Sequence, residues 1–309
     1  MVPATPLPAL PPDTLRPVSA VHRLAFAYAN DLFFGTDYYF TQGLALDVVS
    51  PALGRWGGRR VLGRGPAGSL RTYGVAVRYD GFTPLRIEDD FIRVGDRPYA
   101  AYFYAALYRE SWRPAAGQRF SRALDVGYLG PAAGGKQVQT GLHALTHNPE
   151  PRGWDYQVRS DVVLGYRLGY EQRLLAAGRW LELTGRADLS LGTLYTYAGV
   201  GGRLRVGRFA SYFAGPAGAA APTWQLYAEA TLEGRLVGYD ATLQGGLLNG
   251  SSPYTLSFAG VRHAVPRGTA SLVVAYRSLS ITATTTTVGP EFAGGRTHRW
   301  GTLVLAREF

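Results

Sequence analysis

Two long stretches of the chain alternate between apolar and polar residues. From 181 to 191 the odd positions hold Leu, Gly or Ala, while the even positions between them hold Glu, Thr, Arg, Asp and Ser. From 224 to 236 the even positions are apolar or Gly, and the odd positions are Gln, Tyr, Glu, Thr, Glu and Arg. A period of two is that of a β-strand, whose successive side chains point to opposite faces. The sequence therefore predicts strands with one apolar and one charged face.

The length of these segments favours strands that cross a membrane. A strand of a globular protein usually has about 5 or 6 residues, whereas a tilted strand needs about 9 to 11 to cross a bilayer. A soluble antiparallel sandwich with one wet face is the alternative. Glu, Arg and Asp together on the polar face instead favour the water-filled or ion-paired lumen of a barrel.

Twelve candidate strands follow one another along the chain, an even number as in single-chain outer-membrane barrels. They are 21–32, 39–50, 69–80, 98–111, 118–129, 155–172, 179–195, 203–214, 223–236, 253–264, 269–283 and 297–309. Turn signals lie at 215–222 and 265–268, and the last strand ends on Phe309, which resembles the assembly signal of outer-membrane proteins. We predict an all-β fold, a twelve-stranded antiparallel transmembrane barrel over 21–309. The Pro-rich residues 1–20 are expected to be a flexible arm of a mature protein without its export signal.

Composition narrows the classes of function. The chain has no cysteine, which excludes disulfides, cysteine-ligated metals and a cysteine nucleophile. Charged residues make up 17%, against roughly 25% in soluble proteins, and no apolar run is long enough for a transmembrane helix. The net charge of +10 is nearly all arginine. No basic stripe with interleaved aromatic residues accompanies it, so we expect no nucleic-acid partner. We expect a monomer.

With a periplasmic N-terminal arm, the outer loops would be 33–38, 81–97, 130–154, 196–202, 237–252 and 284–296. Polar residues then gather at the outer ends of the first six strands. They are Asn30, Asp31, Thr36, Asp37, Thr41, Glu88, Asp89, Asp90, Asp96, Arg97, Gln139, His143, His147 and Glu150. Three loops on one rim would build a site at the outer leaflet.

Three motifs carry a family resemblance. NDLFFGTDYYFTQG at 30–43, GDRPYA at 95–100, and GPAAGGKQVQTGLH followed by GW within 130–154 resemble the LpxR-type lipid A 3′-O-deacylases. The resemblance covers roughly residues 22–160. It implies a twelve-stranded outer-membrane barrel that removes the 3′-linked acyl chains of lipid A, the lipid of lipopolysaccharide, in a calcium-dependent reaction.

The resemblance also assigns roles to residues. His143 would be the base, in a mechanism similar to that of secreted phospholipase A2, with Ca²⁺ as the electrophile. Asn30, Asp31 and Thr41 offer the oxygen atoms that calcium prefers. On a short helical segment in the third outer loop, Gln139 would share a face with His143 and orient it or the substrate.

Two departures from the family pattern concern its other polar groups. Some members carry an acidic residue six places after the histidine, where this chain has Pro149 followed by Glu150, so a one-residue shift would give Glu150 that role. The second-loop lysine of some members has no counterpart, and the single lysine of the chain, Lys136, lies in the third loop.

Each assignment has a structural alternative. His143 could be a packing residue, and Asn30 and Asp31 could be ordinary turn formers. Asp96 and Arg97 are expected to form an ion pair that closes the second loop. His143 and His147 have a zinc-binding spacing but lack the glutamate of H-E-x-x-H.

Alternatives to the enzyme are an outer-membrane porin or channel and a structural barrel without activity. The arginines of the connection near residue 60 are expected to lie in a solvated periplasmic loop. They are Arg55, Arg59, Arg60 and Arg64.

Overall fold

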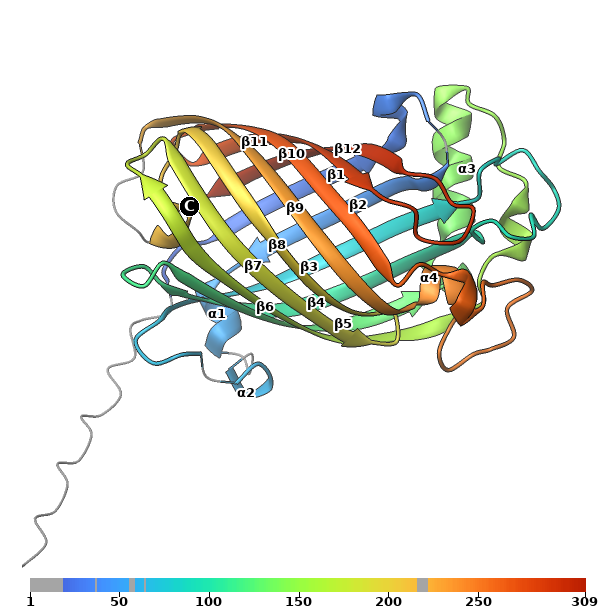
Figure 1. Cartoon of the computed structure of the whole chain (residues 1–309), viewed down its shortest axis with the longest axis horizontal. Helices are drawn as coiled ribbons and strands as arrows, with labels where there is room; N and C mark the ends of the chain where they lie inside the picture. Colours follow the sequence, from blue (N-terminus) through green and yellow to red (C-terminus); the bar gives the residue numbers. More distant parts are fainter. Residues whose placement is uncertain (1–18, 37, 56–58, 64, 216–221) are drawn as a thin grey trace, which may run out of the picture.

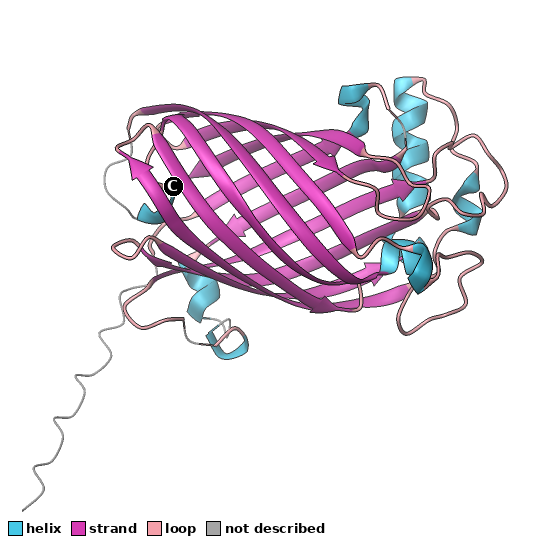
Figure 2. Ribbon diagram, viewed as in Figure 1, coloured by secondary structure: helices cyan, strands magenta, loops and turns pink. Residues whose placement is uncertain are grey.

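The computed structural model describes residues 19–36, 38–55, 59–63, 65–215 and 222–309. These residues form a closed barrel of twelve antiparallel strands (Figures 1 and 2). Each strand pairs with its sequence neighbours, and β1 pairs with β12 to close the sheet. The strands are β1 (Arg23–Asn30), β2 (Tyr39–Val49), β3 (Leu70–Thr83), β4 (Ala100–Arg113), β5 (Gln118–Leu129), β6 (Asp161–Ala177), β7 (Leu181–Gly192), β8 (Tyr195–Arg208), β9 (Trp224–Asp240), β10 (Ala264–Tyr276), β11 (Leu279–Val288) and β12 (His298–Glu308). The predicted fold class is confirmed.

Short helices lie outside the strands. They are η1 (Asp31–Phe34), α1 (Pro51–Leu53), α2 (Arg59–Val61), η3 (Pro131–Ala133), α3 (Gly135–Thr146), η4 (Gly153–Tyr156), η5 (Tyr212–Ala214), α4 (Ala241–Gln244) and η6 (Phe258–Gly260). Among the described residues, none of these helices is long and apolar enough to cross a membrane.

The alternation along the strands separates the two faces of the wall. On β9, Leu226, Leu232 and Leu236 are exposed on the outside, while Thr231 and Glu233 are buried inside. Charged groups in the lumen pair with one another: Arg119 contacts Glu110 and lies 2.9 Å from Glu171. The lumen is therefore ion-paired, as the charged faces predict.

The two ends of the barrel differ. Near the first residue of β1 and the last of β12, three connections are tight turns, at 114–117, 178–180 and 277–278. The opposite end carries the long loops 84–99, 130–160 and 241–263, and with them α3 and α4 (Figure 1). Outer-membrane barrels have short periplasmic turns and long extracellular loops, so the end with α3 is the outer one.

Several predicted boundaries are wrong. Residues 196–202, predicted as an outer loop, lie within β8, and the turn is at 193–194. Glycine is needed in this part of β8 for close strand contact, because a Cβ on Gly201 would lie 2.2 Å from the Leu232 carbonyl oxygen. The predicted strand 269–283 spans the end of β10, the turn 277–278 and the start of β11.

The predicted turn at 265–268 is also wrong, since these residues belong to β10. Pro266 precedes Arg267, where the ladder with β11 begins, so its missing N–H leaves no gap in that ladder. The predicted strand 253–264 is mostly loop. Its tyrosine, Tyr254, accepts a hydrogen bond from the Gly95 amide (2.7 Å) and donates one to the Asp96 carbonyl (3.0 Å), which ties two outer loops together.

Four sequence interpretations fall wholly or partly outside the described residues. They concern residues 1–18 of the predicted arm, Asp37 of the first loop, Arg64 of the arginine-rich connection and residues 216–221 of the predicted turn at 215–222.

Candidate functional site

Helix α3 lies against the outer rim of the barrel through one narrow stripe. Its buried residues are Gly135, Gln139 and His143, spaced four apart and therefore on one face. A Cβ on Gly135 would lie 2.6 Å from both the Ala101 Cβ and the Trp154 ring. Only glycine allows this approach, so Gly135 sets how deeply the helix sits. The predicted helical segment in the third outer loop is confirmed.

Gln139 connects the helix to two other elements. It is fully buried; its Nε2 donates to Thr41 Oγ1 at 3.2 Å, and its Oε1 accepts from the indole Nε1 of Trp154 at 2.7 Å. Trp154 is itself fully buried and packs on Tyr99 with ring centroids 4.9 Å apart. The amide therefore fixes the position of Thr41 relative to the helix that carries His143.

His143 is held by a backbone group. Its Nδ1 lies 2.7 Å from the carbonyl oxygen of Pro149, and the side chain is buried. A carbonyl only accepts hydrogen bonds, so Nδ1 carries the hydrogen and, in the neutral ring, Nε2 carries the lone pair. Pro149 occupies the place six residues after the histidine. The side chain of Glu150, the next residue, is exposed.

Asn30 and Asp31 close the first outer turn. Asn30 is the N-cap of η1, where its Oδ1 accepts from the Leu32 amide at 2.7 Å, and Asp31 Oδ2 accepts from the Tyr38 amide at 3.0 Å. Both residues are therefore turn formers, as the structural alternative proposed. Both are also buried, at 7% and 3% exposure, which is unusual for polar residues that only form a turn.

Thr41 lies at an irregularity in β2. Phe40 pairs with Phe82 and Gln42 pairs with Gly81, so Thr41 is an extra residue on this strand. Tyr39, two residues earlier, has a φ of 69°, a left-handed conformation that few non-glycine residues adopt. Bulges re-aim side chains at the rims of barrels, and this one accompanies the buried contact of Thr41 with Gln139.

The side chains at the rim offer a hard cation three kinds of oxygen. Asp31 supplies a carboxylate, Asn30 an amide oxygen with a second lone pair beside its cap bond, and Thr41 a hydroxyl. This donor set fits calcium. Within the described ranges, no three His, Cys, Asp or Glu side chains gather into a metal site. The described residues of the rim therefore form no cage of acidic side chains, and they offer no further ligands for zinc at His143 and His147.

Arg97 of the second loop does not pair with Asp96, so that prediction is wrong. Its guanidinium points inward, 3.0 Å from Glu291 Oε2 and 2.8 Å from Thr242 Oγ1, and lies 4.4 Å above the ring of Phe82. Asp96 instead accepts from the Leu85 amide at 2.9 Å. Burial would raise the pKa of Glu291, but the positive charge of Arg97 lowers it. Arg97 thus joins three outer loops by contacts that its sequence neighbours do not indicate.

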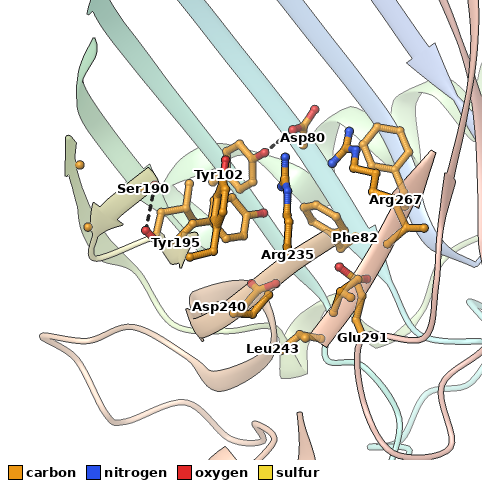
Figure 3. A pocket seen from close by; sticks show the side chains of 18 of the residues that line it. Asp80, Phe82, Tyr102, Ser190, Tyr195, Arg235, Asp240, Leu243, Arg267 and Glu291 are labelled. Atoms are coloured by element: carbon orange, nitrogen blue, oxygen red, sulfur yellow. Dashed lines mark hydrogen bonds between the residues drawn. The ribbon is translucent and has the colours of Figure 1, made fainter. Parts of the chain in front are cut away.

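A polar cavity of about 260 Å³ lies in the lumen below the outer loops (Figure 3). Asp80, Tyr102, Tyr195, Arg235 and Arg267 are among its lining residues, and the Tyr102 hydroxyl donates to Asp80. Phe40, the neighbour of Thr41, also lines it. The cavity therefore lies next to the strand that carries one of the candidate ligands.

Comparisons with known proteins agree with the barrel. The solved structure of LpxR from Salmonella typhimurium is similar, with a TM-score of 0.74 and 17% identity over 92% of this chain and 99% of that one. The β domain of the Bordetella autotransporter Brka has a TM-score of 0.44 and 11% identity, over 94% of this chain and 99% of that one. Comparison with curated protein sequences gives no match.

The family comparison extends over nearly the whole chain. Residues 6–309 match the family described as "Outer membrane protein LpxR". The match includes the strands of the second half as well as the three motifs of the first. The chain therefore belongs to the LpxR family of outer-membrane proteins.

Proposed function

We propose that the chain is a lipid A deacylase that hydrolyses the 3′-linked acyl ester at the outer leaflet, with His143 as the general base. The observation that carries this proposal is the contact of His143 Nδ1 with the Pro149 carbonyl, 2.7 Å away. This contact makes Nε2 the basic nitrogen of the buried His143. The histidine lies one helical turn after Gln139, whose side-chain amide donates to Thr41. Membership in the family supports the choice of substrate.

The reaction needs one proton acceptor and a stabilised oxyanion. Nε2 of His143 takes a proton from water while the water oxygen bonds to the ester carbonyl carbon. The tetrahedral intermediate then breaks its bond to the sugar oxygen, and the imidazolium returns the proton to that oxygen. The products are a fatty acid and a free 3′-hydroxyl group on the sugar. While the ring is charged, the Pro149 carbonyl accepts the Nδ1 hydrogen and stabilises it.

The other candidate residues have supporting roles. Asn30, Asp31 and Thr41 would hold a calcium ion, which when bound supplies positive charge where the oxyanion develops. Gln139 is a positioning residue, because its amide joins Thr41 to α3. Glu150, which follows Pro149 and has an exposed side chain, would take the place of the acidic residue that some family members carry after the histidine.

Mass spectrometry of lipid A from a Gram-negative host that expresses the chain tests the proposal. We expect lipid A from cells that express the wild-type chain to be lighter by the mass of the 3′-linked acyl group. Lipid A from cells that express His143→Gln should keep its full mass. The matched control is His147→Asn, because His147 is exposed at the end of the same helix and asparagine tolerates its left-handed backbone. Unchanged lipid A with the wild type, or full activity of the His143 variant, would contradict the assignment.

A porin or a structural barrel is the other candidate function. The Arg119 contacts with Glu110 and Glu171 place paired charges on the lumen face of the adjacent strands β4, β5 and β6, which favours a filled barrel over an open one. Ion conductance in planar bilayers, together with unchanged lipid A, would support the channel instead.

A further inference from the structure

The connection between β2 and β3 is unusually long for the periplasmic end. Residues 50–69 contain α1 and α2, whereas three other connections at this end are tight turns. The described residues of this segment, 50–55, 59–63 and 65–69, lie against the outside of the wall (Figure 1). Leu62 within it is completely buried, and Arg109 of β4 donates to the Leu62 carbonyl at 2.9 Å. The segment therefore covers part of the face that other strands turn to lipid.

Arginines are placed opposite one another on this covered face. In the strand register, Tyr73, Arg109, Arg122 and Leu168 lie side by side across β3, β4, β5 and β6. Glu110, next to Arg109, contacts Arg119 in the lumen, so the row points outward. Like charges directly opposite on neighbouring strands repel. The Arg109–Arg122 pair thus needs a compensating anion.

The part of the chain that the structure describes supplies no such anion. Among the described residues, no carboxylate forms an ion pair with Arg71, Arg109 or Arg122, whereas Arg119 and Arg167 of the lumen have acidic partners. The Nε atoms of Arg71 and Arg109 are buried without a hydrogen-bond partner. We call Arg71, Arg109 and Arg122 the outer arginine cluster.

A groove of about 610 Å³ lies beside this cluster. Arg109 and Arg122 line it, together with the apolar side chains of Phe120, Leu168 and Leu189. Arg109 stands four residues before the end of β4, which is about 13 Å along a strand. The arginines lie near the membrane boundary, where they match the anionic headgroup of a lipid. The apolar side chains beside them match its acyl chains.

We propose that this groove binds one anionic glycerophospholipid of the periplasmic leaflet. The lipid's phosphate would contact Arg122, whose planar fork suits phosphate oxygens, and its acyl chains would lie along Leu168 and Leu189. Arg109 is only 1% exposed, so it would attract the phosphate by its charge without touching it. The lipid would fasten residues 50–69 to the wall, because Arg109 holds the Leu62 carbonyl as well. This site lies at the other end of the barrel from His143 and does not depend on the proposed deacylase function.

Native mass spectrometry of the full chain in detergent tests this proposal. The probes are dioleoylphosphatidylglycerol, which is anionic, and dioleoylphosphatidylcholine, which carries no net charge. We expect preferential retention of one phosphatidylglycerol, reduced roughly fivefold by Arg122→Gln, the factor for one arginine near an anionic headgroup. Arg122→Lys should retain an intermediate amount. Arg307→Gln is the matched control, because Arg307 is an exposed arginine near the same end, on β12.

Controls keep the test decisive. The heat-dependent shift in electrophoretic mobility shows whether each variant is folded, and Arg122→Lys carries the comparison if Arg122→Gln fails to fold. Equal retention of the two lipids by the wild type would overturn the proposal, as would wild-type retention by folded Arg122→Gln. Release of phosphatidylglycerol by excess inorganic phosphate, with no preference between the lipids, would identify a site for free anions only.

Discussion

Replacing Gln139 by leucine tests whether its amide holds the site together. Leucine has a similar size but cannot accept from the Trp154 indole (2.7 Å) or donate to Thr41 Oγ1 (3.2 Å). The indole N–H would then be a buried donor without a partner, which costs about 1 to 3 kcal/mol. We expect Gln139→Leu to lower kcat/KM by roughly 5- to 150-fold, which corresponds to the same range of free energy.

A double-mutant cycle separates positioning from general damage. Trp154→Phe removes the indole N–H and keeps an aromatic ring, so in the double variant the penalty for the unpaired donor disappears. We expect the double variant to be more active than the product of the two single effects predicts, with a coupling of at least about 0.5 kcal/mol. The assay is the initial rate of fatty-acid release from lipid A in mixed micelles. Additive effects would refute the argument that Gln139 acts through Trp154.

Three further predictions concern the metal, the loops and the helix. Chelation of calcium should abolish deacylation, and added Ca²⁺ should restore it. Asp31→Asn should raise the Ca²⁺ concentration that gives half-maximal activity. Deacylation in excess chelator would contradict the role of calcium. Because the pKa of Glu291 is lowered in the folded state, its contribution to stability is present above the unfolded value of about 4.3 and is lost as the pH falls through the folded value. The outer loops should therefore become sensitive to an acid-active protease only in strong acid. Arg97→Met should move this sensitivity to higher pH, because burial then raises the pKa of Glu291 against less positive charge. Gly135→Val should displace α3 and abolish activity in a barrel that still folds. Gly141→Ala should retain activity, because its Cβ would meet nothing within 4 Å. Equal activity of the two variants would show that the close approach of Gly135 is unimportant.

The strands could be predicted from the sequence where the two faces of the barrel wall alone determine the alternation of polar and apolar residues. A period of two with charged and apolar faces located β7 and β9, because lumen and lipid impose opposite preferences on alternate residues. The region before β10 was predicted wrongly. Residues 253–263 alternate as well, but there the pattern reflects loop packing, in which Tyr254 binds the backbone at Gly95 and Asp96. Alternation over a short segment cannot distinguish these two causes.

The candidate site was predictable only where its geometry is local. Helical spacing was enough to put Gln139 and His143 on one face, and the structure has both buried on α3. The partner of His143 Nδ1 is a backbone carbonyl, which any residue type would supply, so no side-chain motif could indicate it. Arg97 and Glu291 are 194 residues apart, and only barrel closure brings their loops together.

The contacts to Trp154 show why the rim can hold a helix in place while facing water. In the sequence the GW dipeptide is only one part of a motif, yet Trp154 lies close against Gly135, packs on Tyr99 of the second loop and donates to Gln139. One rigid ring thus fixes helix depth, loop position and amide orientation together. As the proposed base, His143 must keep Nε2 in a fixed position, and it needs such support because loops at a barrel mouth otherwise have few buried contacts. We therefore expect the catalytic geometry to depend on Trp154 as strongly as on Gln139, although Trp154 takes no part in the chemistry.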